Sequence, residues 1–124
     1  PYKAHECFEH LYYQIPMELF FNKNYRDKLN SDSKILYGFL LNRLTLSAKN
    51  NWIDENGNVF LIFTRKEVQE RLDLSDKTVT KAFKQLKDCK LIHEKRQGAN
   101  KPNLIYVRKI DHDCTEPKKL DSIN

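Results

Sequence analysis

A row of cationic and polar side chains between residues 75 and 85 suggests a specific chemistry. Lysine ammonium groups can donate to guanine acceptors or to phosphate oxygens, and a threonine methyl group can contact thymine. These residues alternate with Val79, Ala82, Phe83 and Leu86, whose helical spacing predicts a buried stripe on the opposite face. We therefore expect one face of a helix to bind DNA. Its candidate residues are Ser75, Asp76, Lys77, Thr78, Lys81, Lys84 and Gln85.

Position along this helix suggests separate tasks for these side chains. Residues near the N-terminus of a recognition helix usually reach base edges. Lys77, Thr78 and Lys81 are therefore expected to contact bases, with Gln85 as a further candidate. Lys84 and Lys87 are expected to hold phosphate.

A second basic group follows in two β-rich runs, Leu91–Arg96 and the run from Leu104. The runs flank a segment with turn residues at Gly98, Asn100 and Pro102, which predicts a hairpin. Its cationic candidates for phosphate or the minor groove are Lys95, Arg96 and Lys101. Gln97 and Asn100 can bond to acceptors on the groove floor or to the DNA backbone.

Helix-capping residues predict the helices that position these two groups of polar side chains. Thr64 with Glu67 three residues later forms a capping box for a first short helix. Asp73 and Leu74 connect it to a second helix that Ser75 can cap. Two short helices, a tight turn and a basic hairpin are typical of a winged helix-turn-helix, in which one helix enters the major groove.

A longer helix from Ser31 to Asn50 is expected to form the centre of the core. Its apolar face is broad and would pack against both helices of the helix-turn-helix. Gly38 within it predicts a close helix crossing. A short helix is expected over residues 15–21 and a polar loop over 22–30. The apolar face comprises Ile35, Leu36, Tyr37, Phe39, Leu40, Leu41 and Leu44.

Between the long helix and Thr64, two strand-like runs flank Asn56-Gly57, a strong hairpin signal. This hairpin exceeds what a minimal winged helix needs. It either extends the sheet of the wing or offers a strand edge to a second copy across a two-fold axis.

Charge and composition are consistent with this interpretation. The chain has 124 residues, enough for one domain, and a net charge of +5. Residues 64–109 contain 13 Lys and Arg against 6 Asp and Glu, a net +7, whereas the remainder is −2. Such polarisation indicates a nucleic-acid face. No apolar run approaches 20 residues and no signal-peptide pattern occurs, so neither membrane partners nor export is expected.

Catalytic, metal and cofactor sites are not predicted. The chain has only three glycines and no phosphate-cradling loop or nucleophile motif, so we expect no enzyme activity and no cofactor. The three cysteines match no disulfide framework, which indicates a reducing cytoplasm. Neither the His5, Cys7 and His10 group nor the His112 and Cys114 pair has an established zinc spacing.

The expected fold class is α+β, mainly α: a winged helix-turn-helix with an additional N-terminal helix or arm and an extra β-hairpin. We expect an arm over residues 1–14, a DNA-binding domain over 15–110 and a linker or tail over 111–124. The absence of an initial methionine predicts that the chain is a fragment, and the charged, proline-bearing tail predicts a linker that leads out of the domain.

Three phrases carry a resemblance to a known family: YYQIPMELFF, NNWIDENGNVFLIFT and RQGANKPNLIYVRKI. Over residues 12–110 the chain resembles the N-terminal domain of RepA_N replication initiators from plasmids of Gram-positive bacteria, including staphylococcal multiresistance plasmids. The resemblance implies a winged helix that binds repeats at the plasmid origin as a homodimer. It also implies a C-terminal domain of the DnaD type that engages host replication proteins. By resemblance, a DNA-facing role extends to Arg96, Gln97, Gly98, Lys101, Pro102 and Asn103.

Two other functions remain open at this point. A winged-helix transcriptional regulator would carry the same DNA-binding elements without a C-terminal replication domain. A winged helix used only for protein contacts would not need so basic a surface.

Overall fold

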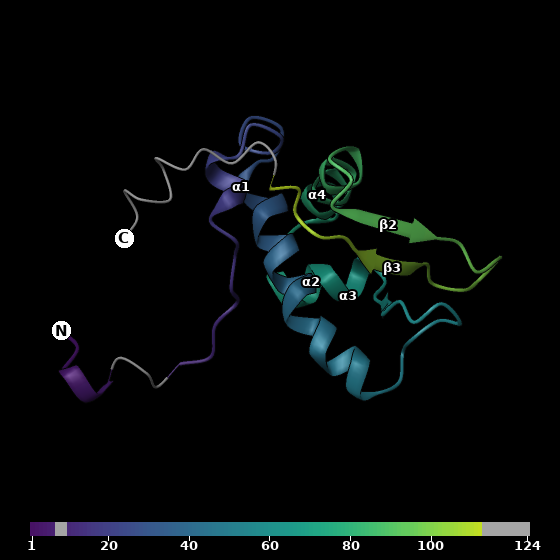
Figure 1. Ribbon diagram of the computed structural model, residues 1–124, viewed down its shortest axis with the longest axis horizontal. Helices are drawn as coiled ribbons and strands as arrows, with labels where there is room; N and C mark the ends of the chain where they lie inside the picture. Colours follow the sequence, from purple (N-terminus) through teal and green to yellow (C-terminus); the bar gives the residue numbers. More distant parts are fainter. Residues whose placement is uncertain (7–9, 113–124) are drawn as a thin grey trace.

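Helix α2 (Ser31–Lys49) is the element on which the rest of the fold packs (Figure 1). The computed structural model describes residues 1–6 and 10–112. Helix α4 (Asp76–Asp88) lies across α2, and α3 (Arg65–Leu72) packs against α4. The remaining elements are η1 (Ala4–Glu6), α1 (Glu18–Phe21), β1 (Leu61–Ile62), β2 (Ile92–Lys95) and β3 (Leu104–Val107). From α2 onward, this order is that of a winged helix, which confirms the predicted fold class.

The helix caps form as the sequence predicts for α3 and α4. Thr64 and Glu67 make both hydrogen bonds of the capping box, 3.1 Å each. Asp73 ends α3 in the left-handed conformation, and the Ser75 side chain accepts from the Thr78 amide at 3.2 Å. The cap of α2 is Asn30, one residue before the expected start. These local bonds fix the turn between the two helices.

The core is formed by one face of each α-helix and the inner face of the sheet. Phe39 and Leu40 of α2 and Phe83 of α4 are completely buried. Ile35, which the sequence assigned to the same face, is exposed because it lies at the edge of the stripe. Tyr25 and Leu29 are buried although their segment was expected to be a polar loop. It folds into consecutive turns, with the Tyr25 and Arg26 amides both donating to the Asn22 carbonyl at 2.9 Å.

Gly38 does permit a close approach, but the approaching segment is not the expected helix. A Cβ atom placed on Gly38 would lie 2.8 Å from Cγ1 of Ile15 and 3.1 Å from the carbonyl oxygen of Gln14. The extended chain before α1 therefore crosses α2 at this point. Any larger residue at position 38 would displace it.

The sheet is antiparallel with the order β1-β3-β2. β3 is central, and Leu61 of β1 pairs with Ile105. The predicted hairpin before Thr64 is reduced to a single bridge between Ile53 and Val59. Asp54 closes its turn by accepting from the amides of Asn56 and Asn58, both at 2.9 Å. Its exit strand, β1, does extend the sheet of the wing.

The C-terminal end of the described body is held by hydrogen bonds to the segment after α1. The Asn22 side chain donates to the Asp111 carbonyl and the Asp111 amide donates to the Tyr25 hydroxyl, both at 2.8 Å. Asp111, one residue past the expected boundary at residue 110, is therefore bonded to the body. Most of the predicted tail, residues 113–124, lies outside the described residues, as do residues 7–9 of the arm. None of the described helices is long and apolar enough to span a membrane.

Candidate nucleic-acid interface

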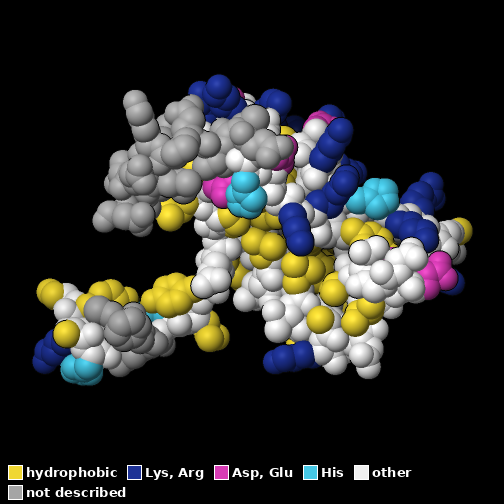
Figure 2. Space-filling view, viewed as in Figure 1, with side chains coloured by type: hydrophobic (Ala, Val, Ile, Leu, Met, Phe, Trp, Pro, Cys, Tyr) yellow, Lys and Arg dark blue, Asp and Glu magenta, His cyan; other side chains and the backbone are white. Residues whose placement is uncertain are grey.

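The outer face of α4 presents most of the α4 side chains that the sequence predicted to contact DNA. Asp76, Lys77, Lys81 and Lys84 are exposed there, and Thr78 is half-buried. Thr80 is also exposed, although it was not among the expected residues. It lies three residues after Lys77 and four before Lys84, and this helical spacing could have identified it. Space-filling shows Lys and Arg side chains over α4 and along the wing (Figure 2).

At the start of α4, two predicted DNA-facing residues have structural tasks. Ser75 is the N-cap, and its hydroxyl also donates to Oγ1 of Thr78 at 2.9 Å. Asp76 accepts from the Gln69 side chain at 3.2 Å, which ties α4 to α3. These bonds set the angle of the turn. The first cationic side chain, Lys77, follows directly and projects from the helix beyond them.

Gln85 does not join the outer face of α4. Its side-chain oxygen accepts from the Asn30 amide and from the Ser33 hydroxyl, both at 2.9 Å. Asn30 is the cap of α2, so Gln85 links the start of α2 to the last turns of α4. The spacing placed Gln85 beside the apolar stripe, and the structure shows that it turns toward the core.

A nearly buried carboxylate joins α3, α4 and the wing. Glu94 on β2 is 6% exposed and accepts two hydrogen bonds from the Arg65 guanidinium, at 2.7 and 3.1 Å. Lys87 lies 3.1 Å from the same carboxylate, and the Asn103 side chain donates to it at 3.4 Å. Burial raises the pKa of Glu94, but the bonds and charges of Arg65 and Lys87 outweigh it and leave the pKa lowered. Lys87, expected to hold phosphate, pairs with Glu94 while its side chain remains 44% exposed.

Arg65 is held on its other side by an aromatic ring. Its guanidinium carbon lies 3.6 Å from the centroid of Phe83, which is completely buried. Stacking and the bidentate bond fix the guanidinium plane. The position of β2 relative to α4 therefore depends on one rigid cluster, Arg65, Phe83, Lys87 and Glu94.

In the wing, the predicted polar residues divide into two groups. The Gln97 side chain donates across the loop to the Pro102 carbonyl at 2.7 Å, and Asn103 bonds Glu94. Gly98 and Asn100 have positive φ angles of 126° and 64°, which the turn requires. These four residues shape the loop. Arg96 and Lys101 are exposed at its end.

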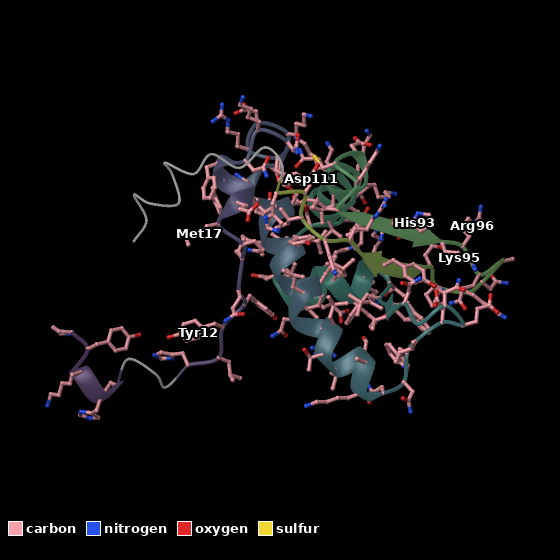
Figure 3. The ribbon with its side chains drawn as sticks, viewed as in Figure 1. Tyr12, Met17, His93, Lys95, Arg96 and Asp111 are labelled. Atoms are coloured by element: carbon pink, nitrogen blue, oxygen red, sulfur yellow. The ribbon has the colours of Figure 1, made fainter. Side chains whose placement is uncertain are left out.

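Lys95 is exposed one residue before the loop (Figure 3). The alternation along β2 places Glu94 toward the helices and Lys95 with His93 on the other side of the strand. Lys95 and His93 line the same groove, on the face of the sheet away from α4.

The remaining titratable residues do not form a metal site within the described ranges, where no group of three His, Cys, Asp or Glu could hold an ion. Cys7 and Cys114 lie outside those ranges. Cys89 is half-buried, and its thiol lies 3.9 Å from the Asn24 carbonyl. Burial raises the pKa of this thiol, which lowers its thiolate fraction and therefore its reactivity.

Comparisons with known proteins find a matching family and solved structures with a similar fold. Residues 11–120 match the family described as Replication initiator protein A (RepA) N-terminus. Three solved structures superimpose with TM-scores of 0.82, 0.81 and 0.79, at 35%, 35% and 34% identity. They are described as the N-terminal domain of a DNA-binding protein, an MDR initiator and a Rep–DNA complex. They cover 98% or more of this chain, which covers 95%, 96% and 97% of theirs.

A longer relative is a 41 kDa protein of Lactobacillus helveticus, 31% identical over 121 residues. The match takes in 93% of this chain but 34% of that protein. The chain therefore spans about a third of the length of this curated relative.

Proposed function

This chain belongs to the family of replication initiator protein A N-termini, and from that premise we propose that it binds double-stranded DNA at the repeats of a plasmid origin and thereby starts plasmid replication. The coarser statement, a DNA-binding domain of a replication initiator, follows from the family. Recognition of particular origin repeats is the proposal. The observation that carries it is the exposed cationic face of α4, which no ion pair neutralises at Lys77 or Lys81 within residues 1–6 and 10–112.

Sequence discrimination is assigned to the first two turns of α4. Lys77, Thr80 and Lys81 project from the outer face, with Thr78 at its edge. In the major groove, ammonium groups can donate to guanine and the threonine methyl groups can contact thymine. Lys84 pairs with Asp88 at 2.9 Å, but an exposed pair of this kind is weak and opens readily toward a phosphate.

Affinity is assigned mainly to the wing. Arg96 and Lys101 extend from a loop that Gln97 and Asn103 hold in shape. These two cationic side chains can contact the phosphate backbone or enter the minor groove. The Glu94 cluster sets the distance between these charges and α4.

The biological setting forms part of the proposal. We assign the domain to the bacterial cytoplasm, where plasmid DNA is replicated, and to a homodimer on repeated sites. Host replication proteins would be engaged by another part of the protein, beyond the third of the relative that this chain matches. The domain itself would bind DNA without catalysing a reaction.

A salt titration with two duplexes tests this function. The chain is mixed with its own plasmid's origin repeats and with a scrambled duplex of equal composition, and binding is followed by fluorescence anisotropy. We expect a preference for the repeats of about a thousandfold and a steep decline of both affinities with salt. Equal, weak binding to the two duplexes would refute origin recognition. A preference for promoter operators over origin repeats would instead indicate a transcriptional regulator.

A further inference from the structure

The segment between α1 and α2, residues 22–30, is a compact loop with a defined shape. Tyr25 and Leu29 are 3% and 6% exposed, and they anchor the loop in the core. The Asn22 side chain accepts from the Asn24 amide at 2.9 Å. The Leu29 amide donates to the Tyr25 carbonyl at 3.0 Å. Side chains on the outside of this loop therefore project from a fixed backbone.

The outside of the loop is cationic. Residues 22–30 hold three cations, Lys23, Arg26 and Lys28, against one carboxylate, Asp27, a net charge of +2. Arg26 lies 3.5 Å from Asp27. Lys23 and Lys28 are exposed, and neither forms an ion pair within residues 1–6 and 10–112. The two lysine ammonium groups are therefore available to an anion outside the chain.

The loop adjoins the second half of α4. The Gln85 side chain accepts from the Asn30 amide at 2.9 Å, and the Cys89 thiol lies 3.9 Å from the Asn24 carbonyl. Burial raises the pKa of this thiol, and the positive charge of Lys28 acts against that rise, which places Lys28 close to the end of α4. The loop and the helix are thus joined at two points, one helical turn apart.

The wing and the loop lie on opposite flanks of α4. Successive residues of a helix are turned by about 100°, so Gln85 and Lys87 point about 80° to either side of Lys77 on the outer face. Gln85 contacts the loop, and Lys87 lies 3.1 Å from the carboxylate of Glu94 on β2. Figure 1 shows the same order, with α4 between the loop that follows α1 and strand β2. The outer face of α4 therefore has a cationic element on each side.

This arrangement matches the two phosphate strands that border a major groove. The groove is roughly 12 Å wide, close to the diameter of a helix with its side chains, so a helix within it has one phosphate strand on each side. The wing provides cations on one side of α4. Figure 2 shows Lys and Arg side chains over the loop after α1 as well, separate from those of the wing.

We propose that the loop of residues 22–30 is a second phosphate-binding element, in which Lys23 and Lys28 contact the DNA strand on the side of the major groove away from the wing. The inference rests on the proposed DNA-binding function and adds a surface that the sequence predicted only as a polar loop. Ammonium groups bind phosphate oxygens of any sequence, so the loop contributes affinity and register rather than base discrimination. Gln85 is then a positioning residue, because it fixes the loop against α4.

A salt titration of single-lysine variants tests the contact. Lys28→Gln and Lys49→Gln each remove one exposed cation, and Lys49, the last residue of α2, is the matched control far from the loop. Lys28→Gln should lower the slope of log affinity against log salt by about one unit, and adding Lys23→Gln should lower it by about one more. Lys49→Gln should leave the slope unchanged. Equal slopes for the Lys23 and Lys28 double variant and for Lys49→Gln overturn the proposal.

Use of origin repeats and scrambled duplex keeps this result separate from the proposed function. Failure of origin recognition would appear as equal binding of the wild-type chain to both duplexes, whereas the loop contact is measured by the slope on either duplex. Lys28→Gln should weaken both duplexes by the same factor and leave the preference for the repeats unchanged. A reduced preference with an unchanged slope overturns the phosphate contact and assigns the loop to sequence recognition.

Directed cleavage locates the contact on the duplex. The three cysteines of the chain are replaced by serine, and an iron–EDTA reagent is coupled to a single new cysteine, introduced as Lys28→Cys, Lys101→Cys or Lys49→Cys. The Lys28→Cys and Lys101→Cys chains should cut the DNA on opposite sides of the major groove that α4 occupies, and the Lys49→Cys chain should give no cuts. Cuts from Lys28→Cys at the positions cut from Lys101→Cys, or none at all, overturn the proposal.

Discussion

Helix α4 and the wing carry similar polar side chains but use them differently. On α4, internal bonds are made by Ser75 and Asp76 at the start and by Gln85 on the inner side. In the wing, Gln97 and Asn103 hold the loop, and Arg96 and Lys101 extend from it. A helix is maintained by its backbone bonds and a buried stripe, whereas a short, polar hairpin needs its own side chains to keep its shape.

The largest effect is expected at Phe83, the α4 residue that supports the cluster joining α4 to the wing. Phe83 is completely buried and lies beneath the Arg65 guanidinium. Phe83→Ala should lower the free energy of unfolding by about 3–5 kcal/mol, as large-to-small core substitutions do. Urea titration measures this change. Ile35→Ala, at the exposed edge of α2, is the control and should have little effect; an equal loss in both variants would contradict the assigned core.

Glu94→Gln should weaken the connection between the wing and α4 without removing any side chain from the hydrophobic core. Arg65 and Lys87 would lose their partner, but both are partly exposed and water would solvate them. The expected loss is therefore roughly 1–3 kcal/mol rather than the larger cost of a fully buried charge. Thermal melts measure the loss, and binding to non-specific duplex should weaken because the wing is no longer fixed.

The same substitution predicts a difference in pH dependence. The pKa of Glu94 is lowered in the folded protein, so its stabilisation is complete above the ordinary value of 4.5 and is lost as pH falls through the lowered pKa. Wild-type stability should therefore decline more steeply than that of Glu94→Gln below pH 4.5. Parallel urea midpoints for the two proteins across this range would show that Glu94 is not the group responsible.

Gln97→Ala is expected to have the smallest effect. The variant loses the bond to the Pro102 carbonyl, worth roughly 1 kcal/mol at an exposed loop. Overall stability should barely change, because the loop lies outside the core. Amide exchange within residues 96–103 should accelerate, and affinity for all duplexes should fall slightly. Unchanged exchange would mean that Gln97 does not hold the loop.

Local patterns predicted most of the fold. The caps at Thr64 and Ser75 and the stripe of α4 depend on neighbouring residues, and they formed as expected. Gln85 and Asn103 could not be assigned from spacing, because their partners, Asn30 and Glu94, belong to other elements. The same is true of Gly38, where the segment that crosses α2 is an extended arm. Thr80 is different, since the helical period alone could have revealed it.

The central claim is that α4 discriminates sequence while the wing supplies affinity. The most direct measurement compares Lys77→Ala with Lys101→Ala on origin repeats and on scrambled duplex across a salt series. Lys101→Ala should weaken both duplexes alike and lower the salt slope by about one unit, whereas Lys77→Ala should also reduce the preference for the repeats by roughly 1–3 kcal/mol. If Lys77→Ala left the preference intact and Lys101→Ala removed it, the wing would be the part that recognises sequence, contrary to this account.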